Sequence, residues 1–204
     1  MRELHRIAMI RSAVAAFALA TLALGCSESG PCGDGVLHGQ GPPNGTLTWC
    51  ARSDGTKHGA WTEWHPIGTT KSKGQYVDGK MDGLWTTFQA DGRKATEGRY
   101  RAGRKEGSWT TWNEEGKRKR ESVHRVDSEE STWTAWRPTG EKWATGGSIG
   151  GRDHGPYSEW HTNGKLAAQG TYANGQKAGE WKYWDVDGNP SVTPTGDLES
   201  ANKP

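Results

Sequence analysis

Histidine pairs are the residues of this chain whose spacing most resembles a chemical site. His58 and His65 lie seven residues apart, and His154 and His161 share that interval. Imidazole nitrogens bind metals and transfer protons near neutral pH. Each pair falls at the same place in an internal repeat, however, and no zinc motif accompanies it. We attribute the spacing to duplication and expect no metal site.

Carboxylates give no catalytic pattern either. Glu63 and Glu159 occupy equivalent positions in distant repeats, and neither has an evident acid–base partner in the sequence. A nucleophile triad and a phosphate-cradling glycine loop are also missing from the sequence. We expect no catalytic residues and no cofactor, and we predict that the protein is not an enzyme.

The N-terminus has the features of an export signal. Three arginines precede a short apolar run at 13–24, which is too short for a comfortable membrane span. The stretch "LALGC" ends at Cys26 and resembles the bacterial lipobox, in which the cysteine is acylated. This resemblance implies a signal peptide at 1–25 and a lipid such as palmitate on Cys26. The alternative is an ordinary signal peptide cleaved near a cysteine.

Composition points to an exported, folded protein without a thick aliphatic core. The 204 residues are only 31% hydrophobic, yet they include 12 Trp and 30 Gly, a pairing that disordered chains lack. The chain contains two cysteines in addition to Cys26. Cys32 and Cys50 are predicted to form a disulfide, because export exposes them to an oxidising compartment and zinc needs more ligands.

A 24-residue repeat accounts for most of the tryptophans. The first aromatic column contains Trp61, Trp85, Trp109, Trp133, Tyr157 and Trp181. The second column, three residues later in each unit, contains Trp64, Phe88, Trp112, Trp136, Trp160 and Trp184. A glycine follows each second aromatic by four residues, and this regularity predicts one structural unit per repeat.

Turn signals identify that unit as a β-hairpin. One end of the units carries Asp91-Gly92, Asn163-Gly164 and Asp187-Gly188, and the other carries Asp54-Gly55, Asp78-Gly79 and Asn174-Gly175. Such pairs favour two-residue hairpin turns, and the Thr-, Trp- and Tyr-rich runs between them favour strands. We predict an all-β fold, an elongated single-layer antiparallel meander of about six hairpins at 45–193. A flexible tether at 26–44 precedes it, and a polar tail at 194–204 follows.

Two-residue turns also imply a register. Trp85 would pair with Gly98, and Gly98 with Gly107, so that an indole lies beside bare backbone. Tyr100 falls on the same face. The face of the first aromatic column is therefore the predicted core.

The second aromatic column is predicted to project from the opposite face, because successive strand residues alternate in direction. Polar and charged residues surround it there, and two interpretations stay open. The rings form an exposed binding ladder, with a repeat of roughly 9.6 Å that suits stacking on sugars. Alternatively, they pack on one another and on the stems of Lys and Arg.

The unit "DGLWTTFQADGRKATEGRYRAGRK" at 82–105 resembles the bacterial variant of the MORN repeat, the membrane occupation and recognition nexus motif. The shared features are G-x-W-x-x-aromatic, an Asx-Gly turn, G-x-Y and a second turn. The resemblance covers about 45–193. It implies an elongated sheet with a binding or scaffolding role, and some bacterial relatives are labelled antitoxins.

The third unit departs from the pattern. Ser122, Asp127 and Ser131 replace expected glycines in a densely charged stretch. Either this unit is bent or it is a specific contact site, and we favour the simpler interpretation of a degenerate repeat. Pro190 and Pro194 end the pattern and would protect the terminal sheet edge from aggregation.

These observations favour a non-enzymatic envelope lipoprotein whose sheet is a protein-interaction scaffold. One alternative is a surface for peptidoglycan or another glycan on the second aromatic column, and another is antitoxin- or immunity-like binding of a toxin. Without residues 1–25 the chain is close to neutral, which argues against nucleic acid and leaves membrane attachment to the lipid. Ser27 after Cys26 lacks the retention signal of inner-membrane lipoproteins, so the resemblance implies an outer-membrane protein facing the periplasm, provided the host has two membranes.

Overall fold

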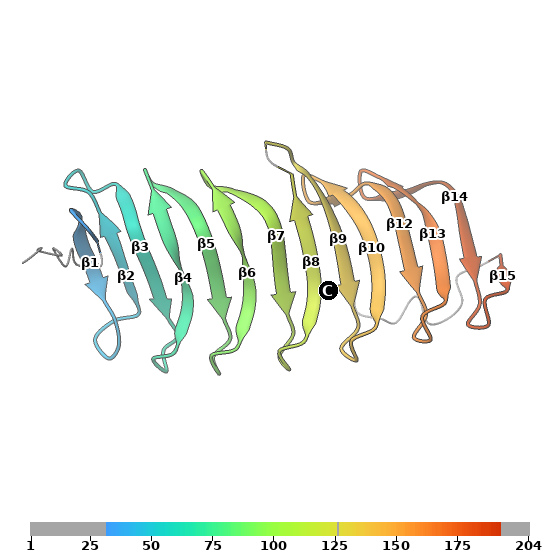
Figure 1. The fold of residues 1–204 in the computed structure, drawn as a ribbon, viewed down its shortest axis with the longest axis horizontal. Helices are drawn as coiled ribbons and strands as arrows, with labels where there is room; N and C mark the ends of the chain where they lie inside the picture. Colours follow the sequence, from blue (N-terminus) through green and yellow to red (C-terminus); the bar gives the residue numbers. More distant parts are fainter. Residues whose placement is uncertain (1–31, 126, 193–204) are drawn as a thin grey trace, which may run out of the picture.

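The computed structural model describes residues 32–125 and 127–192, which form one open antiparallel sheet of fifteen strands. Strands that follow one another in sequence lie side by side in space, as Figure 1 shows from β1 to β15. The predicted all-β meander of consecutive hairpins is confirmed. No helix in the described residues is long and apolar enough to cross a membrane. The predicted signal peptide, Cys26 and the polar tail at 194–204 lie outside the described residues.

The strands are β1 (Val36–Gln40), β2 (Leu47–Ala51), β3 (Lys57–Trp64), β4 (Thr70–Val77), β5 (Lys80–Phe88), β6 (Lys94–Arg101), β7 (Arg104–Trp112), β8 (Arg118–His124), β9 (Glu130–Trp136), β10 (Lys142–Ile149), β11 (Arg152–Asp153), β12 (Gly155–Trp160), β13 (Leu166–Ala173), β14 (Gln176–Trp184) and β15 (Pro190–Ser191). β11 pairs with β10 beside the main path of the sheet.

The sheet begins earlier than the repeat pattern predicts. β1 lies within the predicted tether at 26–44, and it pairs with β2 over five residues. This edge strand lacks the aromatic columns, so the repeat does not reveal it. Cys32 and Cys50 form a disulfide with an S–S distance of 2.07 Å, which links the segment before β1 to β2.

Two kinds of hairpin turn occur along the sheet. Two-residue turns with positive φ at both positions form at Asp78-Gly79, Ala102-Gly103 and Asn174-Gly175. The other end of the units has three-residue loops, in which Gln89 N donates to Arg93 O and Gly92 supplies the left-handed residue. The predicted two-residue turns are therefore wrong at Asp91-Gly92, Asn163-Gly164 and Asp187-Gly188. At the first end, Asp54-Gly55 also lies in a three-residue loop, because Arg52 N donates to Thr56 O.

Bulges adjust the register between the turns. Trp85 pairs with Gly98, as predicted, but Gly98 pairs with Trp109. The predicted pairing of Gly98 with Gly107 is wrong because Gly107 (φ 63) and Ser108 form a bulge. A shift of two residues leaves every side chain on its own face, since a strand alternates with a period of two.

The first aromatic column and the strand glycines share one face, in a cross-strand row that contains Trp61, Gly74, Trp85, Gly98, Trp109, Ser122, Trp133 and Gly146. The rings lie over the glycines. A Cβ added at Gly98 would lie 2.1 Å from Trp109 Cδ2. Trp85, Trp109 and Trp133 are only 6–8% exposed, so ring packing on bare backbone replaces the missing aliphatic core.

Candidate binding groove

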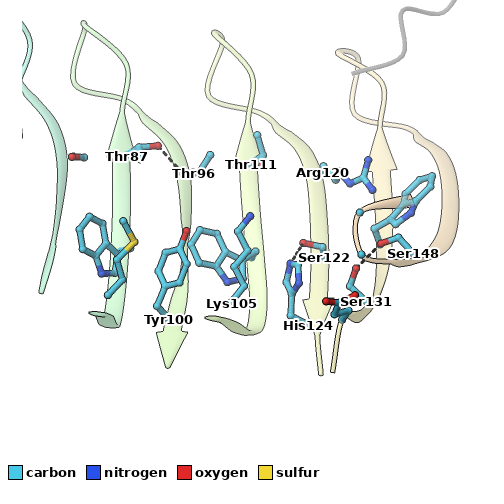
Figure 2. A pocket seen from close by; sticks show the side chains of 18 of the residues that line it. Thr87, Thr96, Tyr100, Lys105, Thr111, Arg120, Ser122, His124, Ser131 and Ser148 are labelled. Atoms are coloured by element: carbon cyan, nitrogen blue, oxygen red, sulfur yellow. Dashed lines mark hydrogen bonds between the residues drawn. The ribbon is translucent and has the colours of Figure 1, made fainter. Parts of the chain in front are cut away.

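The face of the first aromatic column is hollowed into a long groove of about 1160 Å³. Its lining residues come from β3 to β13, so it runs across the strands. Figure 2 shows hydroxyl, cationic and aromatic side chains from neighbouring strands projecting into it. Three cross-strand rows build the groove, with the aromatic row in the middle.

One flanking row is rich in hydroxyl groups. Successive pairs along it join Glu63, Ser72, Thr87, Thr96, Thr111 and Arg120. Thr87 Oγ1 and Thr96 Oγ1 are hydrogen-bonded at 2.7 Å. Glu63 accepts hydrogen bonds from Lys71 Nζ at 2.7 Å and Ser72 Oγ at 3.2 Å. The bond from Lys71 is the main reason that the pKa of Glu63 is below its usual value.

The other flanking row follows a 24-residue column of tyrosines. Tyr76 and Tyr100 pack their rings against Trp85 and Trp109, at centroid distances of 5.4 and 4.9 Å. Burial raises the pKa of both tyrosines. Two members of the column are not tyrosines, since His124 and Ser148 stand where the period places tyrosines. The centre of the groove is therefore lined by smaller, polar side chains.

The centre of the groove belongs to the third unit, in which Ser122, Asp127 and Ser131 stand in place of the expected glycines. β8 and β9 pair without a shift from His124↔Ser131 to Arg120↔Ala135, so the unit continues the sheet in regular register. Ser131 replaces a glycine that is left-handed in other units, and the bulge disappears with it. Ser122 Oγ and His124 Nε2 share a hydrogen bond of 3.0 Å.

Lys105 and Arg120 extend over the tryptophans of the floor. Lys105 Nζ lies 4.5 Å from the Trp109 ring, and Arg120 Cζ lies 4.2 Å from the Trp133 ring. Partial burial lowers the pKa of each cation, and the charge of Arg120 lowers that of Lys105 further. Burial is also the main cause that lowers the pKa of His124, and the charges of Lys105 and Arg120 lower it further. Lys105, Arg120 and His124 therefore lie close enough at the centre of the groove for their charges to interact.

Arg120 is a functional candidate that inspection of the aromatic columns misses. It belongs to a 24-residue column whose other members are Ser72, Thr96, Ala144 and Ala168. A long cation in a column of small residues is the signal that could have revealed it.

A polar cluster lies toward the C-terminal end of the groove. The Glu159 carboxylate is 7% exposed and accepts hydrogen bonds from Trp143 Nε1 at 3.0 Å and Tyr157 Oη at 2.8 Å. Burial is the main cause that raises the pKa of Tyr157, and the Glu159 charge adds to it. Trp143 is outside both aromatic columns, so the repeat does not predict this cluster. Both oxygens of this buried acid have a donor, which indicates a structural role.

Comparison with known families identifies the repeat. The family model described as MORN repeat variant matches residues 153–174. The chain contains a MORN repeat. The match spans the hairpin of β12 and β13, and the same hairpin geometry in the other units is consistent with a MORN-repeat protein. No curated protein matches the chain in sequence.

The second aromatic column lies on the opposite face of the sheet. Its rings flank a row that includes Lys73, Thr86, Glu97, Thr110 and Glu121. All six rings are half-buried. Cations lie over four of them, in the pairs Lys73–Phe88, Lys94–Trp112, Arg118–Trp136 and Lys142–Trp160. This arrangement agrees with packing on Lys and Arg side chains, and the glycan ladder stays a prediction.

Two of the histidines connect consecutive units of the repeat. His65 Nε2 donates to Phe88 O at 3.0 Å, and His161 Nε2 donates to Trp184 O at 2.9 Å. His58 lies instead beside Asp78, with Nδ1 3.5 Å from a carboxylate oxygen. Within 32–125 and 127–192 no three His, Cys, Asp or Glu side chains are grouped as metal ligands. His65 and His161, which occupy equivalent positions of the repeat, make the same contact to the following unit.

Proposed function

We propose that this protein is a non-enzymatic scaffold that binds a partner protein in the groove of its MORN-type sheet. The observation that carries the proposal is the continuity of the groove, which extends over strands β3 to β13 of one sheet. Repeat sheets present long surfaces in which each unit adds similar contacts. The match of residues 153–174 to the MORN repeat variant model is consistent with a repeat-based binding scaffold.

The character of the groove favours a polypeptide over a sugar polymer. Three tryptophans of its floor, Trp85, Trp109 and Trp133, are 6–8% exposed and lie over glycines or beneath cations, so they offer little open ring surface for stacking. The flanking row instead presents hydroxyl groups such as Thr111, which can donate and accept hydrogen bonds. Backbone amides and polar side chains of a partner would match this row.

We further propose that the scaffold is exported and held at a membrane by lipid on Cys26. The features that support this are the apolar run at 13–24 and the lipobox-like "LALGC". Labelled palmitate should be incorporated by the natural chain and not by a Cys26→Ser variant. Equal labelling of the two would contradict the lipid attachment.

The binding proposal is tested with two adjacent threonines. Thr111 lies in the groove, whereas Thr110 lies on the opposite face, and both are half-buried. Thr111→Arg should reduce co-purification of the partner from cells of the natural host at least tenfold, because the longer side chain fills the groove. Thr110→Arg should leave the yield within about twofold. Equal effects of the two variants would contradict binding through the groove.

A second measurement, on the purified chain, distinguishes peptidoglycan binding from binding of a partner protein. Purified sacculi should leave the protein in the supernatant if a protein is the partner. Pelleting that is abolished by Trp136→Phe and Trp160→Phe would support the second aromatic column as a glycan-binding surface instead.

A further inference from the structure

We infer that the centre of the groove binds the carboxylates of an extended acidic segment in the partner protein. The inference rests on the proposed scaffold function and deepens it by assigning the chemistry of the partner. Lys105 and Arg120 are the two residues assigned to pair with these carboxylates. They project from adjacent strands, β7 and β8, into the same groove.

Space for a side chain arises where the tyrosine column is interrupted. Ring contacts run from Trp49 to Trp109 along the floor and the tyrosine row, and they resume between Trp133 and Tyr157. His124 on β8 stands between these two runs, and Ser148 follows on β10. Both are smaller than the tyrosines at equivalent positions of the repeat. An entering group can therefore approach the cations at this point.

The two cations lack an anionic partner in the part of the chain that is described. Some other cations of the sheet are paired, namely Lys71 with Glu63 at 2.7 Å, Lys94 with Glu97 at 2.7 Å and Arg118 with Glu121 at 3.4 Å. No such ion pair forms for Lys105 or Arg120 among residues 32–125 and 127–192, although the Asp153 charge acts on Arg120. Arg120 is half-buried, whereas Lys105 is exposed, and a half-buried cation without a counter-ion is unfavourable. Binding a carboxylate would relieve this cost.

The side chains are already oriented for such an interaction. Both cations rest on tryptophan rings at 4.5 and 4.2 Å, which limits the freedom that they would lose on binding. Ser122 and Ser131 add hydroxyl groups nearby, as the lining of the groove and Figure 2 show. Charged and hydroxyl donors together are suited to carboxylates.

Acidic residues of the groove define the direction of the segment. Glu129 and Asp153 line the groove beyond Arg120 toward the C-terminal units. They would repel acidic groups on that side and favour their placement between Lys105 and Arg120. An extended segment would continue from there along Thr111 and the hydroxyl row toward β5.

The test uses the purified mature chain and three fluorescein-labelled peptides of equal length, octaglutamate, octaglutamine and octalysine, with fluorescence anisotropy as the measurement. Octaglutamate should bind at least tenfold more tightly than the other two, and added salt should weaken its binding. Arg120→Gln should weaken octaglutamate binding at least tenfold, and Lys105→Gln at least threefold. Arg118→Gln is the matched control, because Arg118 also lies over a tryptophan but on the opposite face. It should change the affinity less than twofold.

Several results would overturn the inference. Equal binding of octaglutamate and octaglutamine would do so, while leaving a groove for a neutral segment intact. An equal effect of Arg118→Gln and Arg120→Gln would also contradict it, since surface charge in general would then explain binding. Tighter binding of an oligogalacturonate of equal charge would assign the site to an acidic glycan. Thermal unfolding of each variant serves as the folding control, and Lys105→Gln provides a second variant if Arg120→Gln unfolds.

Discussion

Replacing Gly98 by alanine should destabilise the sheet because the Trp109 ring occupies the space of the new methyl group. A Cβ at Gly98 would lie 2.1, 2.3 and 2.4 Å from three atoms of the indole. Real Cβ atoms do not approach other heavy atoms this closely, so the ring has to move. Gly98 is in extended backbone that alanine also adopts, and steric displacement is therefore the main effect.

The expected cost can be built from the contacts of the ring. Inserting a methyl group into a packed site costs about 1–3 kcal/mol. Trp109 Nε1 would lose its 3.0 Å hydrogen bond to Arg99 O, worth about 1 kcal/mol. The edge-to-face contact with Tyr100, at a centroid distance of 4.9 Å, adds about 1 kcal/mol. The free energy of unfolding should fall by about 3–5 kcal/mol.

A double-mutant cycle isolates the ring as the cause. Gly98→Ala is measured by urea unfolding in the natural chain and in a Trp109→Leu background. We expect its cost to fall below about 1 kcal/mol in that background, because the indole is gone. The reasoning is refuted if Gly98→Ala costs the same in both backgrounds or costs almost nothing in the natural chain.

Three further predictions concern single positions. Ala102 has a φ of 49° in a two-residue turn, so Ala102→Asn should stabilise the protein by roughly 0.5–1 kcal/mol in thermal unfolding, and a lower melting temperature would contradict this. The hydrogen bond from Lys94 is the largest cause that lowers the pKa of Glu97. The stabilisation of the fold by ionised Glu97 is therefore complete above the unfolded pKa of about 4.3 and is lost as the pH falls through the lower folded pKa. Urea unfolding at a series of pH values should therefore show a smaller acid-induced loss in Glu97→Gln than in the natural chain, and identical profiles would disprove it. Tyr157→Phe removes one of the two donors to the buried Glu159 and should cost about 1–3 kcal/mol, a change that urea unfolding would detect and whose absence would argue against the hydrogen-bonded cluster.

The sequence predicts the meander well because its signals repeat. Aromatic columns, strand glycines and Asx-Gly turns recur every 24 residues, and together they predict the hairpins and the pairing of Trp85 with Gly98. The bulge at Gly107 is not predictable in this way, because a glycine in a strand can be either paired or left-handed. β1 at Val36–Gln40 is missed for a different reason, since an edge strand outside the repeat has no column to reveal it.

The groove is less predictable than the fold. Its floor follows from the first aromatic column, but its chemistry depends on departures from the repeat. The sequence shows Ser122 and Ser131 in place of expected glycines. Without the strand register, however, it does not show that they lie in the same groove as Arg120 and Lys105. A one-residue shift between Thr111 and Trp112 in the β7–β8 pairing places Arg118 and Arg120 on opposite faces. Alternation alone would place both on the same face.

Photo-crosslinking in living cells of the natural host tests the scaffold proposal most directly. A benzoylphenylalanine is introduced at Thr111, in the groove, or at Thr110, on the opposite face. The proposal predicts that illumination joins the Thr111 variant to one discrete protein of the cell and that the Thr110 variant gives little of this product. Equal products from both variants, or a product from Thr110 alone, would contradict binding through the groove.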